Sequence, residues 1–352
     1  TALLPVLTAE APTVEAGRLR ALATAAVEVP RQLTLVAPTS VAIGTAAARA
    51  TAAPPSTATA YAHAYQHVKD SCQGGNPYLA VTQFVPMTDG SGNAYGQAWL
   101  KGQAAVVALN DTVGDDLALH HNLAYQDQVG AVFGVAMDLT RDRIYLGAYT
   151  KRLAGYGPLG PGGIYQVDLA RGTVLPWAAL PAGRDSHRFN QGFDQAAANS
   201  VGVTALGDLE LTTAGDQLFA VNLSDGYVYR FAVPSGRLLG AFPHGAAGLD
   251  WAEDARPFAL AWKEGWLFHG VVDSRTRDAQ ATNNPAPRPL AAYVYRSRPD
   301  GSEMTEVLRV DLDYGRQPVW SPWPRVVDDG QTIDQPMLVD IEFREDGDLV
   351  LG

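Results

Sequence analysis

Four carboxylates occupy matching places in two similar stretches of this sequence. "DLELTTAGDQLF" begins at Asp208 and "DIEFREDGDLVL" begins at Asp340; both run Asp, aliphatic, Glu, apolar, and later Gly-Asp before an apolar run. Residues i and i+2 of a strand point to the same side. Asp208 with Glu210, and Asp340 with Glu342, therefore form two pairs on strands that we place innermost in the fold. Carboxylate oxygens converging there from different strands would bind Ca²⁺ or another hard cation.

The same four carboxylates have a structural alternative. Buried carboxylates also accept hydrogen bonds from backbone amides of a neighbouring strand, and structural networks collect them as readily as metal sites do. Two further copies of the frame have apolar residues where the Glu stands, Ala136 and approximately Leu260, so no fourfold ring of ligands is expected. Both alternatives remain open, and Ca²⁺ is the one cofactor candidate.

Two other groups of residues are candidates for binding. "WSPWP" places Trp320 and Trp323 in a loop, where aromatic rings would serve as a platform for sugars or peptides. Lys151 and Arg152 would line a face and bind an anion, although exposed basic residues more often stay solvated. The other tryptophans mostly fall at strand positions, where core packing is expected.

No stretch of the sequence carries a recognisable catalytic motif. "GYGPLG" matches a dinucleotide-binding pattern, but a Pro-Gly-Gly and then a strand follow it where that pattern needs a helix. A G-x-S-x-G elbow is missing. His63 and His67 have helical spacing without the Glu of a zinc protease, and His120-His121 is expected in a polar loop. We assign no catalytic residues.

The carboxylate frame recurs because the chain repeats one supersecondary unit. "GVAMDLTRDRIY" (Gly134–Tyr145) and "FALAWKEGWLF" (Phe258–Phe268) are the further copies. Each copy predicts strand, tight turn, strand, since Gly and Asp tolerate hairpin backbone angles. Each complete copy is followed by another strand pair. The first unit is "FGVAMD", "RIYLGAYT", "GIYQVDL", "TVLPWAAL"; the second is "LGDLEL", "QLFAVNL", "YVYRFAV", "RLLGAF"; the third is "FALAWK", "WLFHGVV", "LAAYVYRS", "MTEVLRVDL".

Recurring four-stranded meanders predict an all-β fold, a β-propeller of about five to seven antiparallel blades. A single blade has two apolar faces, which are buried only against neighbouring blades. The polar and Gly/Pro-rich inserts between strands should lie on the propeller's faces, where loops carry binding. The fourth copy ends at Gly352 after two strands. We expect the natural chain to continue, with N-terminal strands also helping to close the propeller.

Residues 1–60 differ in composition from residues 61–352, which we assign to the propeller. They are rich in Ala, Thr, Val and Pro, and predict an extended N-terminal arm or linker. Within them, residues 14–29 predict a short helix, residues 32–44 a strand, and residues 48–60 a flexible linker. The strand would pair with a sheet edge of the same chain or of another copy.

Composition narrows the function. The 352 residues carry a net charge of −11 with no basic run, which disfavours nucleic acid and anionic lipid as partners. Cys72 is the single cysteine, so an intramolecular disulfide is excluded. No stretch is long and apolar enough to span a bilayer. The initial Thr suggests that something upstream was removed, such as a signal peptide, although an arbitrary boundary would look the same.

An ordered set of segments resembles a known group of proteins. "VGAVFGVAMD", "AYTKRLAGYGPLGPGGIYQVDL", "VGVTALGDLELTTAGDQLFAVNL", "RPFALAWKEGWLFHGVV", "LAAYVYRSR", "WSPW" and "QPMLVDIEFREDGDLVLG" are similar to the propeller-like region of large secreted bacterial surface proteins. Such proteins often carry Sdr-type B repeats or Ig-like modules downstream. The resemblance covers roughly residues 78–352. It implies an exported, extracellular protein and supplies no catalytic residues.

The sequence therefore predicts an exported structural or adhesive cell-surface module. Its partners would be other copies of itself or cell-surface proteins and glycans, and the N-terminal arm would join copies into a filament or surface layer. Two alternatives stay open. One is a hydrolase or lyase that uses a cation in the central channel, and the other is a glycan-binding propeller.

Overall fold

The computed structural model describes residues 78–352, except 90, 111–119, 191, 278–288, 315–322 and 324–334. All described residues belong to one of the two units into which the chain divides, the unit of residues 42–352. Several predictions concern residues outside the described part and stay predictions. They are the N-terminal arm with its helix and strand, the boundary at residue 60, and the assignments made for His63, His67, Cys72 and Trp320.

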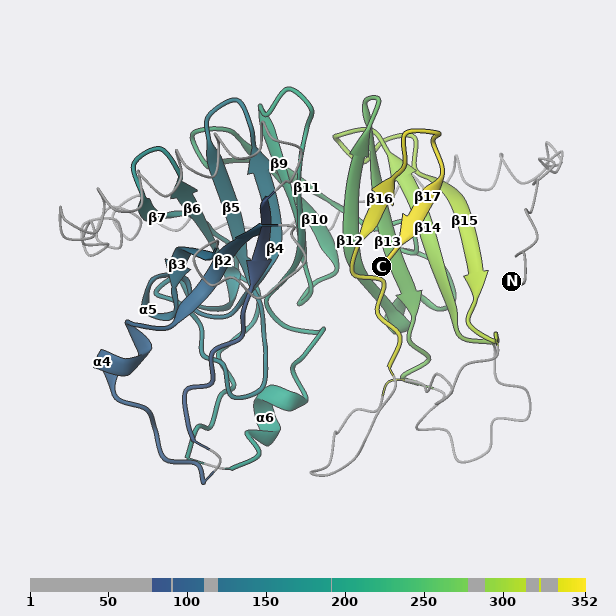
Figure 1. The fold of residues 1–352 in the computed structure, drawn as a ribbon. Helices are drawn as coiled ribbons and strands as arrows, with labels where there is room; N and C mark the ends of the chain where they lie inside the picture. The colour runs from purple at the N-terminus through teal and green to yellow at the C-terminus, as the bar shows by residue number, and fades with distance from the viewer. Residues whose placement is uncertain are drawn as a thin grey trace, which may run out of the picture. The chain divides into compact units, whose positions relative to one another are not determined.

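The described residues of the second unit form five antiparallel sheets that follow one another along the chain (Figure 1). Three of them are complete four-stranded meanders in which every strand pairs with the next. They are β4–β7 (Val132–Asp138, Arg143–Ala148, Gly163–Asp168, Thr173–Ala179), β8–β11 (Leu206–Leu211, Gln217–Asn222, Tyr227–Ala232, Arg237–Pro243) and β12–β15 (Ala255–Lys263, Trp266–Asp273, Ala291–Ser297, Thr305–Asp311). All twelve strands predicted from the three copies are confirmed.

A three-stranded sheet precedes these meanders and a hairpin follows them. The first comprises β1 (Tyr78–Thr82), β2 (Ala104–Asn110) and β3 (His120–Tyr125), and the hairpin comprises β16 (Ile341–Phe343) and β17 (Leu349–Leu351). The expectation of a polar loop at His120-His121 is wrong. Both histidines lie in β3 opposite Leu109 and Ala108, because pairing with the apolar β2 outweighs the polar character of the segment itself.

The first strand of each complete meander contains the same irregularity. The ladder shifts between Val132 and Val135 in β4, between Leu206 and Leu209 in β8, and between Pro257 and Leu260 in β12. A bulge at one fixed place re-aims the following side chains in the same way in each sheet. Val135 and Leu209 therefore occupy equivalent positions in the first two meanders.

In the third copy this register moves the predicted equivalence by one residue. Leu260 stands where Leu209 stands, and Ala261 occupies the Glu210 position. The approximate assignment of Leu260 to the Glu position is thus corrected to Ala261. The conclusion that the position is apolar in this copy is unchanged.

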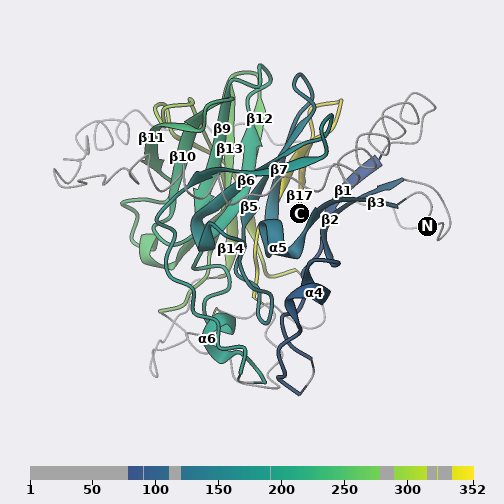
Figure 2. The same cartoon turned by 90° about the vertical axis from the view of Figure 1, so that its left-hand side faces the viewer.

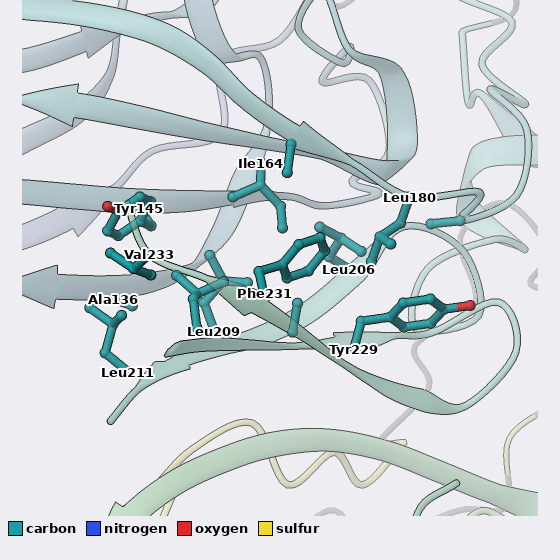
Figure 3. Close-up of a cluster of buried hydrophobic side chains, with 14 residues drawn as sticks. Ala136, Tyr145, Ile164, Leu180, Leu206, Leu209, Leu211, Tyr229, Phe231 and Val233 are labelled. Carbon is teal, nitrogen blue, oxygen red and sulfur yellow. The ribbon is translucent and has the colours of Figure 1, made fainter. Parts of the chain in front are cut away.

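Successive sheets pack face to face through their apolar side chains. One cluster joins β4–β7 to β8–β11 and includes Tyr145, Ile164, Leu209 and Phe231, all fully buried or nearly so (Figure 3). Equivalent clusters join the β1–β3 sheet to β4–β7, the β8–β11 sheet to β12–β15, and the latter to the β16–β17 hairpin. Each meander thus buries the face of the next, as the repeat predicted.

The first strands of neighbouring sheets also contact one another, β4 with β8, β8 with β12, and β12 with β16. Glycine permits the closest approach. A Cβ on Gly134 would lie 2.6 Å from the Gly207 carbonyl oxygen, and one on Gly207 would lie 3.1 Å from the Phe258 carbonyl oxygen. Four-stranded meanders whose first strands meet in chain order define a β-propeller.

The long connections leave the sheets at one end. Hairpin turns join β4 to β5, β8 to β9 and β12 to β13 at the opposite end, so the β5–β6, β7–β8, β13–β14 and β15–β16 connections all leave where the first strands begin (Figures 1 and 2). We call this end the insert face. It carries the short helix α6 (Gln195–Ala198) and the 3₁₀ turns η2 (Gly160–Gly162) and η3 (Ala252–Asp254), while α4 (Gln97–Leu100) and α5 (Gln126–Val129) belong to the N-terminal sheet. In the described part of the chain, no helix is long and apolar enough to cross a membrane.

Candidate functional site

The predicted central carboxylates lie on two of the innermost strands, with Asp208 and Glu210 on β8 and Glu342 on β16. Asp208 connects its own sheet to the next. Its Oδ2 accepts a hydrogen bond from the Leu260 backbone N–H at 3.0 Å, and its Oδ1 accepts one from the Leu209 N–H at 2.8 Å. Leu260 sits at the end of the β12 bulge. For Asp208, the structural role predicted as the alternative is therefore the one observed.

The four carboxylates are close enough to influence one another's ionisation. Burial raises the pKa of Asp208 well above its ordinary value, and the Glu210 and Asp340 carboxylates raise it further, against the lowering effect of the Leu260 and Leu209 amides. Burial, followed by repulsion from Glu342, raises the pKa of Glu210 to about 8. Burial and Asp340 raise the pKa of the more exposed Glu342. The structure therefore brings these four residues together, close enough for their charges to act on one another.

This grouping does not amount to a complete cation site. A Ca²⁺ ion takes about six to eight oxygen ligands. Among residues 78–352, wherever they are described, no group of three or more His, Cys, Asp or Glu side chains is arranged to hold a metal ion. Both Asp208 oxygens already accept backbone amides. The calcium hypothesis stays a prediction, and we assign no reaction to a bound cation.

A cavity opens on the insert face beside the third meander and encloses about 280 Å³. We call it the insert-face cavity. Four connections and one strand end surround it: the β7–β8, β11–β12 and β13–β14 connections, described residues of the β15–β16 connection, and the start of β12. Its lining includes Asn199, Asp254, Arg256, Thr276, Trp323 and Gln335.

Trp323 forms one wall of this cavity. Only 4% of the residue is exposed; its indole N–H donates to the Pro336 carbonyl at 2.9 Å and its backbone N–H donates to the Ser274 carbonyl at 3.0 Å. The ring edge lies against Gly202, where a Cβ would approach it to 2.5 Å. Trp323 is therefore a packed wall that fixes the β15–β16 connection, and little of its face is open as the platform we expected.

Arg256 supplies a cation to the cavity lining. Its Nη1 donates to the carbonyls of Ala255 at 2.9 Å and Glu253 at 3.2 Å, and its Nη2 donates to Thr276 Oγ1 at 3.3 Å. The guanidinium lies 5.7 Å from the centroid of the Trp323 ring. Within the described residues no carboxylate forms an ion pair with it. Burial lowers the pKa of Arg256, while the more distant Asp254 and Asp273 act in the opposite direction.

Arg277 is the second cation of the lining, and it is already paired. Its Nε donates to Asp254 Oδ2 at 2.9 Å, its backbone N–H donates to Asp254 Oδ1 at 2.9 Å, and its Nη1 lies 3.6 Å from Glu253 Oε2. The Asp254 charge is thus matched by Arg277. Of the two arginines, Arg256 is the one whose charge lacks a directly bonded carboxylate in the described part of the chain.

Lys151 and Arg152 lie in the β5–β6 connection, also on the insert face, but they do not line the cavity. Lys151 Nζ is 5.1 Å from the Phe84 ring centroid and the Arg152 guanidinium is 4.5 Å from that of Phe193. Both residues are exposed. Such cation–π contacts hold the side chains over aromatic rings and leave the charges accessible.

A buried His–Asp pair on the same face was missed from the sequence. Asp194 Oδ2 accepts a hydrogen bond from His187 Nδ1 at 2.7 Å and one from the Leu153 N–H at 3.0 Å, and Oδ1 accepts one from the Arg188 N–H at 2.7 Å. This carboxylate joins the β5–β6 and β7–β8 connections. Asp194 adopts a left-handed φ of 52°. Seven residues separate it from His187 within a polar insert, a spacing that matches no motif.

Comparison with known proteins identifies no family. No protein-family profile matches the chain. It is 28% identical over 174 residues to Colossin-D of Dictyostelium discoideum, a match that covers 47% of this chain and 18% of that protein. The chain therefore spans less than a fifth of the length of this curated relative.

The fold is similar to several solved structures at low levels of agreement. The nidogen/laminin complex gives a TM-score of 0.37 with 11% identity over 59% of each chain. A putative TolB from Agrobacterium tumefaciens gives 0.35 with 11% identity, covering 60% of this chain and 58% of the other. A streptogramin B lyase structure gives 0.33 with 14% identity over 71% and 70%. Because these TM-scores are below 0.5, the function has to be argued from this chain's own residues.

Proposed function

We propose that this chain is the β-propeller module of an exported cell-surface protein and that it works by adhesion through its insert face. One observation carries the proposal: the β5–β6, β7–β8, β13–β14 and β15–β16 connections leave the sheets at the same end, where they hold a polar cavity and two accessible cations, Lys151 and Arg152. Rigid sheets that present clustered loops are the usual architecture of binding propellers.

The internal contacts support a scaffold. The two carboxylate oxygens of Asp208 accept hydrogen bonds from a backbone amide of its own strand and from one of β12. These bonds connect two neighbouring sheets. Asp194 likewise joins two connections of the insert face. Groups held in this way make the face rigid before a partner arrives, and pre-organisation reduces the entropy that binding costs.

The partner is a component of the cell surface, either another copy of this chain or a surface protein or glycan. Export and surface location rest on the resemblance of residues 78–352 to secreted bacterial surface proteins. Assembly into a filament or layer through residues 32–44 rests on the strand pattern of that segment. Both belong to the proposal.

The test measures retention of the purified chain on intact cells and on isolated cell-envelope material. A Lys151→Glu/Arg152→Glu double variant reverses two accessible charges of the insert face. Arg237→Glu is the control, since Arg237 is exposed at the start of the outer strand β11, at the end of the sheet opposite the insert face. We expect the double variant to bind about tenfold more weakly and the control to bind as the unmodified chain does. Equal loss in both variants, or no retention of the unmodified chain on any envelope material, would contradict the proposal.

A further inference from the structure

We propose that the insert-face cavity is a subsite for an acidic sugar residue, whose carboxylate pairs with the Arg256 guanidinium. This inference rests on the proposed adhesive function and names the ligand class of one part of the same face. It depends on three features of the cavity: the pairing of its charges, the kinds of groups in its lining, and its size.

The charges of the lining leave one cation in need of a partner. Arg277 donates two hydrogen bonds to the Asp254 carboxylate, one from Nε and one from its backbone N–H. Its Nη1 also lies 3.6 Å from Oε2 of Glu253, whose side chain is 80% exposed. Among the described residues, Arg256 donates only to two main-chain carbonyls and the Thr276 hydroxyl. Partly buried charges are normally paired, because desolvation without a counter-charge is costly.

Acidic groups and a histidine lie near Arg256, and each affects how the arginine would meet an anionic ligand. Asp254 and Asp273 are negative groups that act to raise the pKa of Arg256, but neither forms an ion pair with it among the described residues. On the other side, burial and then the charge of Arg256 lower the pKa of His244 to about 4, so this imidazole is neutral near pH 7. Among the described residues, an incoming carboxylate therefore meets no carboxylate already bonded to Arg256. A guanidinium is suited to bind carboxylate oxygens through paired donors.

The neutral part of the lining suits a polyhydroxylated ring. Asn199, Thr276 and Gln335 contribute amide and hydroxyl groups that both donate and accept, as sugar hydroxyls require. Val201 and Val203 contribute apolar surface for ring carbons, and the packed Trp323 closes one wall of the cavity. Mixed polar and apolar walls of this kind distinguish a sugar from a simple inorganic anion, which would use only the cation.

The size of the cavity restricts the ligand to one residue. Its volume of about 280 Å³ lies just below the range of about 300–1,000 Å³ that small-molecule pockets occupy. A single terminal acidic sugar fits this volume better than an internal segment of a longer chain. The subsite would therefore recognise the end or a side branch of a surface glycan.

The experiment titrates the complete chain with methyl β-D-glucuronide by calorimetry and by saturation-transfer NMR. Methyl β-D-glucoside, which has the same ring without the carboxylate, is the matched ligand control, and sodium acetate tests for a bare anion site. We expect the glucuronide to bind at least about tenfold more tightly than the other two. Equal binding of glucuronide and glucoside, binding of acetate as tight as that of the sugar acid, or no binding of the glucuronide would each overturn the inference.

Variants test the role of Arg256. Arg256→Gln removes the charge and should weaken glucuronide binding about tenfold or more, while Arg237→Gln on β11, at the opposite end of the sheets, should leave it unchanged. Because Arg256→Gln also loses contacts to two carbonyls, Thr276→Val provides a second variant that keeps the side-chain shape and the charge but removes one acceptor of the guanidinium. It should weaken binding by a smaller factor. Unchanged binding in a folded Arg256→Gln variant would refute the pairing.

The outcome is separable from that of the adhesion test. If the glucuronide fails to bind but envelope retention still depends on Lys151 and Arg152, the subsite is refuted and the adhesive function stands. If the glucuronide binds through Arg256 but the chain is not retained on envelope material, the subsite stands and the adhesive function is refuted.

Discussion

Replacing Gly134 with Ala tests the face-to-face packing of the sheets at its narrowest point. A Cβ on Gly134 would lie 2.6 Å from the Gly207 carbonyl oxygen and 2.9 Å from the Leu209 backbone nitrogen, against an ordinary contact of 3.4–4 Å. Both obstructing atoms belong to the backbone of β8. They cannot rotate away as a side chain could, so β4 and β8 must separate.

The size of the effect follows from two opposing contributions. Overpacking at a rigid contact costs about 1–3 kcal/mol, and the backbone nature of this contact favours the upper half of that range. Ala restricts the unfolded chain more than Gly does and returns about 0.5–1 kcal/mol. The free energy of unfolding should therefore fall by about 2 kcal/mol, which corresponds to a Tm lower by about 4 °C for a domain of this size.

Gly240→Ala is the matched control. Gly240 lies in the outer strand β11, and a Cβ there would meet no atom within 4 Å. This variant should be neutral or slightly more stable than the unmodified chain. The measurement is urea denaturation of both variants followed by tryptophan fluorescence, together with Tm by calorimetry. If Gly134→Ala is as stable as Gly240→Ala within about 0.5 kcal/mol, the inner strands do not approach as described and the packing argument is wrong.

Three further outcomes are expected. The folded state raises the pKa of Glu210 from its ordinary value of 4.5 to about 8, so between these values the native state holds a proton that the unfolded state releases. This contribution to stability is fully present below pH 4.5 and is lost as the pH rises through 8. Glu210→Gln should therefore reduce the fall in Tm over that window by the equivalent of about 1–2 kcal/mol, whereas Glu345→Gln, in an exposed turn, should not. Asp208→Ala should leave the Leu260 amide without its acceptor, so the hydrogen exchange of this amide should become faster and the free energy of unfolding should fall by about 1–3 kcal/mol. EDTA should not change the Tm of the unmodified chain. A drop in Tm with EDTA would instead favour the calcium hypothesis. Asp194→Ala should loosen the β5–β6 and β7–β8 connections that this carboxylate joins, so trypsin should cleave after Arg188 faster than in the unmodified chain. An unchanged cleavage rate would show that other contacts hold the two connections.

The blades were predictable because their determinants are local. In the turn after β9, Asp225 Oδ1 accepts the Tyr227 N–H and Gly226 adopts a φ of 74°. In the next turn, Gly236 adopts a φ of 69°. These residues specify the turns wherever they occur, and the apolar runs between them supply the strands. Once four such strands repeat, mutual burial of their faces leaves few alternatives to a propeller.

Register within the third copy was less accessible from the sequence. The third frame has a shorter turn, Glu264-Gly265, and no gap marks the bulge between Pro257 and Leu260. A bulge adds one residue to one strand and turns every later side chain, so alignment by residue type alone placed Leu260 where Ala261 belongs. The β3 strand was missed for a related reason, since its polar His120-His121 is stabilised by β2 and not by its own propensity.

The insert-face cavity was beyond sequence reasoning because its parts come from separate connections. Trp323 was singled out for its type, but its burial depends on Pro336, Ser274 and Gly202. Arg256 gave no signal, since it follows a 3₁₀ turn and begins a strand like many others. The unequal pairing of two arginines with the nearby carboxylates appears only when the three-dimensional arrangement is known.

The positions of the carboxylates in the two regions lead to a division of roles within the propeller. Near the innermost strands, the Asp208 oxygens accept hydrogen bonds from backbone amides, and burial followed by repulsion from Glu342 raises the pKa of Glu210. Added negative charge is therefore disfavoured there. On the insert face, Asp254 is neutralised by Arg277, and Arg256 remains without a directly bonded carboxylate among the described residues. An anionic partner is therefore repelled from the inner strands and attracted to the connections. This difference in charge makes the insert face, and not the channel, the expected place for recognition.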